Sequence, residues 1–295
     1  MKNFTSFSEE IKNAIAYAMP CAELKLTTVN KSSGSYEGLT VSTDKTGICP
    51  VLNLSAAYQQ YEDGTPIDTI IDGLLGILAS VRKPSIDKSM LLDFEAVKGR
   101  IFPRLINTSA HSDYLETHPH KEIEDLSITY AVRVEETADG IAEAVIDYNL
   151  QEHWNVCTED IHEAAMANIS RISPVFGNIE DMLFNQQGGA VEDAKDIDEV
   201  CVPLYILTTP TKCKGATMVL NAKVMESIID RFGEIYIIPS SVDEVLILPK
   251  TFGRDVSDLV KMVKEVNASE VRPEDRLSDN VYEYDIKTGR IAIAV

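Results

Sequence analysis

The residues best suited to chemistry lie in the middle of the chain, in the segment HPHKEIED. Side chains of a strand alternate between its two faces, so every second residue shares a face. An extended segment here would gather two imidazoles and two carboxylates, which zinc, manganese and iron accept as ligands. The divalent metal ligands predicted on this basis are His118, His120, Glu122 and Glu124.

A second interpretation of this segment needs no metal. Pro119 disfavours a regular strand at the start of the cluster, and the strand DLSITYAVRV is expected to begin after it. The two histidines would then be exposed on an acidic loop. A metal-dependent, hydrolase-like enzyme is therefore one alternative for the function, and no catalytic residue is assigned.

Cys157 is a possible nucleophile, because it directly precedes a helix expected to begin at Thr158. A helix N-terminus lowers the pKa of a thiol, and His153 and His162 are near in sequence. Nearby acids oppose the thiolate, so Cys157 is interpreted as a partly buried structural thiol. These acids are Glu152, Glu159, Asp160 and Glu163.

The serine pair Ser240–Ser241 lies in neither a GxSxG nor an SxxK pattern, and Pro239 and Asp243 favour a structural turn. A phosphate loop, a GxGxxG fingerprint, an HExxH helix and a calcium loop are all absent from the sequence. No cofactor other than the divalent metal is therefore expected. Trp154, the only tryptophan, is predicted to anchor a core.

The charge is concentrated in one third of the chain. The 295 residues carry 27 basic and 47 acidic side chains, a net charge of −20. Residues 111–200 hold 4 basic and 21 acidic side chains, a net of −17, whereas residues 1–110 and 201–295 are nearly balanced. Such a field repels phosphate backbones, so direct nucleic-acid binding is disfavoured and a basic partner protein is favoured.

The function that these features favour is a cytoplasmic interaction or regulatory protein with an acidic docking surface. An acidic mimic of nucleic acid, bound to a DNA-binding protein, is another alternative. A solvated surface that only maintains solubility accounts for the charge equally well. The oligomeric state stays open.

The cellular location is inferred from apolar runs and cysteines. The N-terminal apolar stretch is interrupted by Glu9 and Glu10, and no run approaches the ~18 residues of a membrane helix. Five cysteines without a CxxC pair indicate reduced thiols rather than a disulfide framework. We therefore expect a cytoplasmic protein without membrane contact.

Hydrophobic periodicity predicts an α+β fold with mixed, largely antiparallel sheets and recurring strand–strand–helix units. The units fall at about residues 36–80, 123–172 and 202–232, the last with strands at 202–208 and 215–221. A helix is predicted over Ser89–Leu105, and two hairpins near residues 235–248 and 281–295.

The chain is predicted to consist of four portions. These are an N-terminal α+β portion (1–110), an acidic strand–strand–helix portion (111–184), a mobile linker or loop (185–200) and a C-terminal α+β portion (201–295). The linker assignment depends on its few apolar residues, which offer little burial to offset the entropy of ordering.

Several spaced blocks resemble an uncharacterised bacterial family. They include HWNVCTEDIHEAAMANISRISP, VPLYILTT followed by GATMVL, IYIIPSSVDEVLILP and VNASEVRPEDRLSDNVYEYDIKTGRI. The family is a domain of unknown function common in anaerobic Gram-positive bacteria, and the likeness covers nearly the whole chain. It implies an intracellular α+β protein without established activity, substrate or cofactor.

The resemblance also implies a set of recurring positions. The family pattern commonly has a histidine where this chain has Asp243, so the turn at 239–243 is not expected to carry a catalytic imidazole. The recurring positions are His120, Asp125, Trp154, Pro239, Ser240, Ser241, Asp279 and Tyr282.

Overall fold

The structure is a computed structural model, and it describes residues 2–31, 34–42, 49–80, 87–137, 140–180 and 203–295. They belong to two compact units, Met1–Asp93 and Phe94–Val295. The α+β class predicted from the sequence is confirmed, and the described strands form antiparallel sheets. The predicted linker 185–200 lies outside the described residues. The other predicted boundaries stay predictions.

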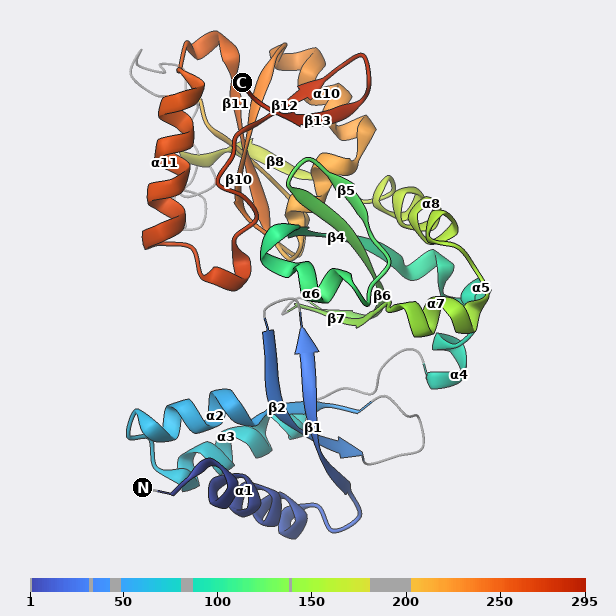
Figure 1. Ribbon diagram of the computed structural model, residues 1–295, viewed down its shortest axis with the longest axis vertical. Coiled ribbons are helices and arrows are strands. Elements are labelled where there is room, and N and C mark those ends of the chain that lie inside the picture. The colour runs from blue at the N-terminus through green and yellow to red at the C-terminus, as the bar shows by residue number, and fades with distance from the viewer. Residues whose placement is uncertain (1, 32–33, 43–48, 81–86, 138–139, 181–202) are drawn as a thin grey trace, which may run out of the picture. The chain divides into compact units, whose positions relative to one another are not determined.

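Unit 1 is a three-stranded sheet, with strand order β1-β2-β3, packed with helices (Figure 1). One face of α1 contributes Phe7, Ile11 and Ile15 to its core, at the helical spacing expected for a buried stripe. Its elements are α1 (Phe4–Ala18), β1 (Glu23–Lys31), β2 (Gly34–Ser42), β3 (Val51–Asn53), α2 (Leu54–Glu62), α3 (Ile67–Ser80) and α4 (Lys88–Leu91).

Unit 2 begins with a sheet that is called sheet B below. Its longest strand, β6, pairs with β4 on one side and with β5 and β7 on the other. Helix α8 packs on β4 and buries Ile161, Ala165 and Ile169. The elements are α5 (Phe94–Val97), η1 (Lys98–Arg100), β4 (Ile101–Asn107), η2 (Ser109–His111), α6 (Ser112–Leu115), β5 (Lys121–Ile123), β6 (Leu126–Thr137), β7 (Gly140–Val145), α7 (Tyr148–Trp154) and α8 (Thr158–Ile169).

The rest of unit 2 is built on sheet C, with strand order β13-β12-β10-β11-β9-β8. Alternation along β11 buries Val245 and Ile247 on one face, while Leu246 and Leu248 face α11. The elements are β8 (Val175–Asn178), β9 (Tyr205–Thr208), η3 (Gly215–Leu220), α10 (Ala222–Phe232), β10 (Ile235–Ser241), β11 (Glu244–Pro249), η4 (Lys250–Phe252), α11 (Val256–Ser269), η5 (Pro273–Asp275), β12 (Tyr282–Asp285) and β13 (Arg290–Ile293).

Two elements differ from the sequence prediction. The helical stretch predicted over Ser89–Leu105 is confirmed only up to Arg100, where it consists of the short helices α4, α5 and η1. From Ile101 the prediction is wrong, because residues 101–107 form strand β4, in which Pro103 lies on an edge strand. The strand predicted over Gly215–Asn221 is wrong as well. This apolar run is the 3-10 helix η3, which is buried on all sides, so its pattern carries no period.

Two further features bear on the sequence predictions. Cys21, Cys49, Cys157 and Cys213 are free thiols, and Cys201 lies outside the described residues. No helix in the described part of the chain is long and apolar enough to cross a membrane.

The position of Gly215 generates a stability prediction. A Cβ at this residue would lie 2.0 Å from Thr208 Oγ1 and 2.2 Å from the Asp243 carbonyl oxygen. Gly215→Ala should therefore lower the free energy of unfolding by about 2–3 kcal/mol, as overpacking does elsewhere. Gly99→Ala is the matched control, since open space surrounds that position. Equal denaturant midpoints for the two variants would contradict the close packing.

Candidate functional site

The two predicted histidine ligands are engaged with the backbone. The His118 ring stacks on Tyr114 with centroids 3.7 Å apart, and its Nδ1 lies 2.7 Å from the Tyr114 carbonyl oxygen. Partial burial lowers the pKa of His118. His120 Nδ1 lies 2.9 Å from the His118 carbonyl oxygen. Both residues precede β5, so strand alternation does not apply to them.

The two predicted carboxylate ligands are exposed. Glu122 lies in the short strand β5, and Glu124 begins the two-residue turn to β6, with φ of 55°. Within the described residues, no group of three or more His, Cys, Asp or Glu side chains could hold a metal ion. This geometry therefore gives the metal site no support, and the site stays a prediction.

Cys157 is exposed, so the partial burial predicted for it is wrong. It forms the N-cap of α8, where its backbone N–H donates to the Asp160 carboxylate at 2.8 Å. His162 on the same helix pairs instead with Tyr130, at 3.0 Å between Nδ1 and the phenolic oxygen. Burial lowers the pKa of His162 and raises that of Tyr130. Cys157 and His162 thus have different hydrogen-bond partners and do not form a nucleophile–base pair.

The turn predicted over residues 239–243 is shorter in the structure, because β10 continues to Ser241 and only Val242 and Asp243 connect it to β11. Polar groups of these residues stabilise the connection. Ser241 Oγ accepts the Asp243 N–H at 3.1 Å, and Ser240 Oγ donates to Glu244 at 3.4 Å. The Asp243 carboxylate accepts the Lys214 N–H at 2.8 Å. These bonds agree with the structural turn that the sequence predicts.

Asp125, at the turn between β5 and β6, has a carboxylate that accepts three side-chain hydrogen bonds. Oδ2 accepts from Ser278 Oγ at 2.6 Å and from Asn280 Nδ2 at 3.1 Å. Oδ1 accepts a short hydrogen bond from the Tyr282 hydroxyl. Burial, then this hydrogen bond, raises the pKa of Tyr282. We call Asp125, Ser278, Asn280 and Tyr282 the Asp125 network.

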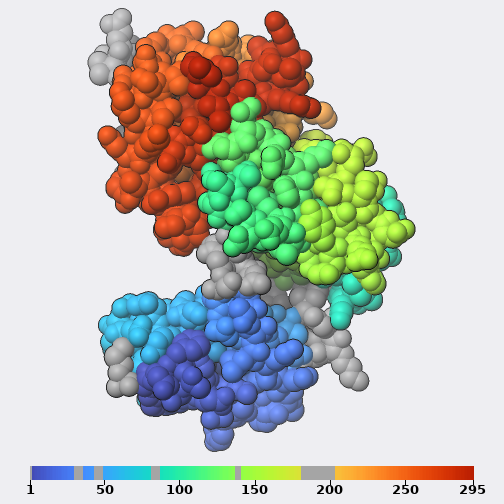
Figure 2. Space-filling view, in the orientation of Figure 1, coloured from blue at the N-terminus to red at the C-terminus, as the bar shows by residue number. Residues whose placement is uncertain are grey.

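The Asp125 network joins sheet B to the segment that enters sheet C. In the space-filling view the green residues of the β5–β6 region abut the red C-terminal residues (Figure 2). Tyr282 is only 1 % exposed, so little room remains for a substrate beside its hydroxyl. We interpret this network as a structural joint.

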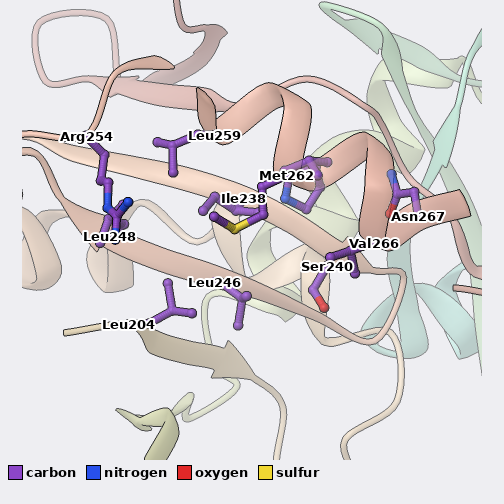
Figure 3. Close-up of a pocket in the computed structure, with 12 residues that line it drawn as sticks. Leu204, Ile238, Ser240, Leu246, Leu248, Arg254, Leu259, Met262, Val266 and Asn267 are labelled. Carbon is purple, nitrogen blue, oxygen red and sulfur yellow. The ribbon is translucent and has the colours of Figure 1, made fainter. Parts of the chain in front are cut away.

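An open apolar groove lies between α11 and sheet C (Figure 3). Its volume is about 240 Å³, more than the ~150 Å³ of an engineered cavity that binds benzene. Leu259 and Val263 of α11 pack on the sheet, whereas Met262 and Val266 are about half exposed. The apolar lining includes Leu204, Ile238, Leu246, Met262, Val263 and Val266.

Polar side chains stand at the ends of this groove. Figure 3 places Arg254 at one end and Ser240 with Asn267 at the other. Both hydrogen bonds that Asn267 Nδ2 donates go to the neighbouring loop, to the Ser278 carbonyl oxygen at 3.0 Å and to Asp279 at 2.8 Å. The groove and the Asp125 network therefore meet at residues 278–279.

Sequence reasoning missed the groove. Met262 and Val266 follow helical spacing, and such residues normally belong to a core. Their exposure depends on how far α11 extends over the sheet, and the local sequence pattern does not encode this tertiary arrangement. Pro239 and Ser240 line the groove, and the family resemblance had marked both. The family resemblance was therefore the one feature of the sequence analysis that pointed to residues of the groove.

A second cavity lies in unit 1, between β3, α2 and α3, with a volume of about 380 Å³. Its polar lining consists of neutral side chains, namely Asn53, Gln60, Thr65 and Thr69. It offers no charge that would select a ligand. The groove of unit 2 is therefore the better-defined candidate site.

Fold and site together define an α+β protein of two units with an apolar groove and a buried polar joint. A family model matches residues 4–286, so the chain belongs to the family of unknown function DUF5688. Neither curated proteins nor solved structures give a match. The family membership agrees with the resemblance in the sequence.

The Asp125 network generates a second stability prediction. Asp125→Ala leaves the donors of Ser278, Asn280 and Tyr282 without their acceptor, and the expected loss in unfolding free energy is about 3–5 kcal/mol. Tyr282→Phe removes one donor and should cost about 1–2 kcal/mol. Urea unfolding of both variants measures these losses.

Glu122→Ala is the matched control, because Glu122 is an exposed acid in the same hairpin. Its effect should stay within about 0.5 kcal/mol. A loss for Asp125→Ala no larger than this control would show that the network does not join the two sheets.

Proposed function

We propose that this protein binds an apolar ligand in the groove between α11 and sheet C. The observation that supports the proposal is the opening of about 240 Å³ itself, which keeps Leu204, Leu246 and Met262 at its surface. Concave sites lined by apolar side chains with a few polar groups are typical of small-molecule binding. A ligand that covers this exposed apolar surface removes it from water, and that burial favours binding.

A ligand can bind in the groove without detaching α11 from the sheet. Leu259 and Val263 fasten α11 to the sheet, where they are 4 % and 6 % exposed. The opening is bordered by the half-exposed Met262 and Val266 of the same helix. A ligand can thus enter while the buried contacts of α11 persist.

Substitution at the edge of the groove tests this function. Val266→Asp places a charge where an apolar ligand must lie, and it should weaken binding of the neutral dye Nile red by about tenfold or more. Val266 is 45 % exposed, so the variant should fold. Fluorescence titration of the full chain measures the affinity.

Ala268→Asp is the control, because Ala268 is exposed on the same helix but does not line the groove. It should bind the dye as the parent does. Unchanged binding in Val266→Asp, or absent binding in the parent, would refute the proposed site.

We propose a second function, the docking of a basic partner protein, from the distribution of charge. Among the described residues of 111–180, 14 are acidic and 3 are basic. The ion pairs there include Arg104–Glu143, Lys121–Glu159 and Arg133–Glu136. The exposed acids are Asp113, Glu116, Glu122, Glu124, Glu136, Glu152, Glu159, Asp160, Glu163 and Glu180. This field opposes direct binding of nucleic acid.

Charge removal tests this second function. Replacement of Glu122, Glu124, Glu135 and Glu136 by Gln should slow association with a lysine-rich peptide by about tenfold at low salt. The difference should shrink at ~0.15 M salt, where the Debye length is ~8 Å. Stopped-flow kinetics at both salt concentrations measure the rate.

The matched control replaces four exposed acids outside residues 111–180, namely Glu226, Glu265, Glu270 and Glu274. It removes the same charge. An equal slowing in both variants would mean that only net charge matters, and the acidic docking surface would be excluded.

The cellular location belongs to the same proposal. Cys21, Cys49, Cys157 and Cys213 are free thiols, which suit a reducing compartment. We place the protein in the cytoplasm on this basis.

A further inference from the structure

We infer that the ligand of the α11 groove is an amphipathic monoanion, an alkyl chain with a carboxylate that pairs with Arg254; this inference depends on the groove binding proposed above. The apolar walls would hold the chain, and the guanidinium would hold the head group. A guanidinium matches the planar carboxylate with two parallel hydrogen bonds. The positive charge of Arg254 therefore favours anionic over neutral apolar ligands in this groove.

Arg254 is the cationic side chain that lines the groove. Within the described part of the chain, no hydrogen bond or ion pair engages it. The acids beside it have other contacts: Asp255 accepts the Ser257 N–H at 2.8 Å and Asp258 pairs with Lys261 at 3.1 Å. The guanidinium thus keeps its donors for a ligand.

The opposite end of the groove does not suit an anion. Ser240 donates its hydroxyl hydrogen to Glu244, and Asn267 donates to the Ser278 carbonyl oxygen and to Asp279. The carboxylates that accept these bonds, Glu244 and Asp279, would repel an anionic head group. The head group must therefore lie at Arg254, with the chain directed towards Met262 and Val266 (Figure 3).

One guanidinium favours a single negative charge. Lys250, the lysine nearest to Arg254 in sequence, is paired with Glu283 at 2.6 Å and with Glu234 at 3.5 Å. A phosphate monoester carries about −1.5 to −2 charges at neutral pH and would need a second cation. A carboxylate is therefore the head group that this site can neutralise.

The test compares two probes of equal chain length, octanoate and octan-1-ol, by calorimetry on the full chain at low salt. The parent should bind octanoate about threefold to tenfold more tightly than octan-1-ol. The expected difference is this small because Arg254 is exposed and water screens its ion pair with the carboxylate. Arg254→Gln should abolish this preference, because octanoate then loses the cation that its carboxylate pairs with. Arg254→Lys should retain part of it.

Arg272→Gln is the matched control, since Arg272 is an exposed arginine outside the groove that pairs with Asp275. It should keep the full preference. Octan-1-ol binding with no preference for octanoate would overturn the inference and leave the groove function intact. A preference that survives Arg254→Gln, or tighter binding of octyl phosphate than of octanoate, would overturn it as well. Binding of neither probe would remove the groove function itself.

Discussion

The architecture of unit 2 depends on one carboxylate that accepts hydrogen bonds from a segment more than 150 residues later. Asp125 occupies a two-residue turn whose first residue, Glu124, has φ of 55°, so the turn backbone sets its position. Ser278, Asn280 and Tyr282 supply its donors. Even a half-buried carboxylate loses hydration, and donors must compensate for it; here they come from the segment that leads into β12 and from its first residue, Tyr282. The bonds thus determine where sheet C meets the hairpin of sheet B.

Two neutral amides complete the same joint. Asn107 donates to the Leu277 carbonyl oxygen at 2.9 Å, and Asn267 donates to that of Ser278 at 3.0 Å. Elsewhere in unit 2, Asn221 at the N-cap of α10 donates to the Ile169 carbonyl oxygen of α8 at 3.1 Å. An asparagine supplies two donors without a charge, so it can link buried backbones at lower desolvation cost than a lysine or arginine. Asn267 also lines the groove, so the amide that secures α11 to the 278–279 loop also closes one end of the candidate site.

Local periodicity was sufficient where a segment buries one face. The helix that ends the predicted unit at 202–232, which is α10, and the β10–β11 hairpin were both predicted, and Trp154 is a core residue at 8 % exposure. Prediction failed at η3, because a run buried on all sides has no period, and at β4, because its preceding short helices continue the helical pattern. The Asp125 contacts join residues separated by at least 153 positions, which no local pattern encodes. The metal prediction assumed an extended segment from His118, whereas β5 begins only at Lys121.

The charges of unit 2 differ in number and position, and this separates the two proposed functions. At ~0.15 M salt an exposed charge acts over ~8 Å, so Arg254 influences an anion only once it has reached the groove. In the proposed docking function, the many exposed acids spread over residues 111–180 add their fields and would act on a large basic partner during its approach. A small monoanion gains little from that field and is held by one guanidinium and by apolar contact. The two proposals thus assign the choice of ligand at the groove and the choice of partner charge to separate sets of residues in one unit.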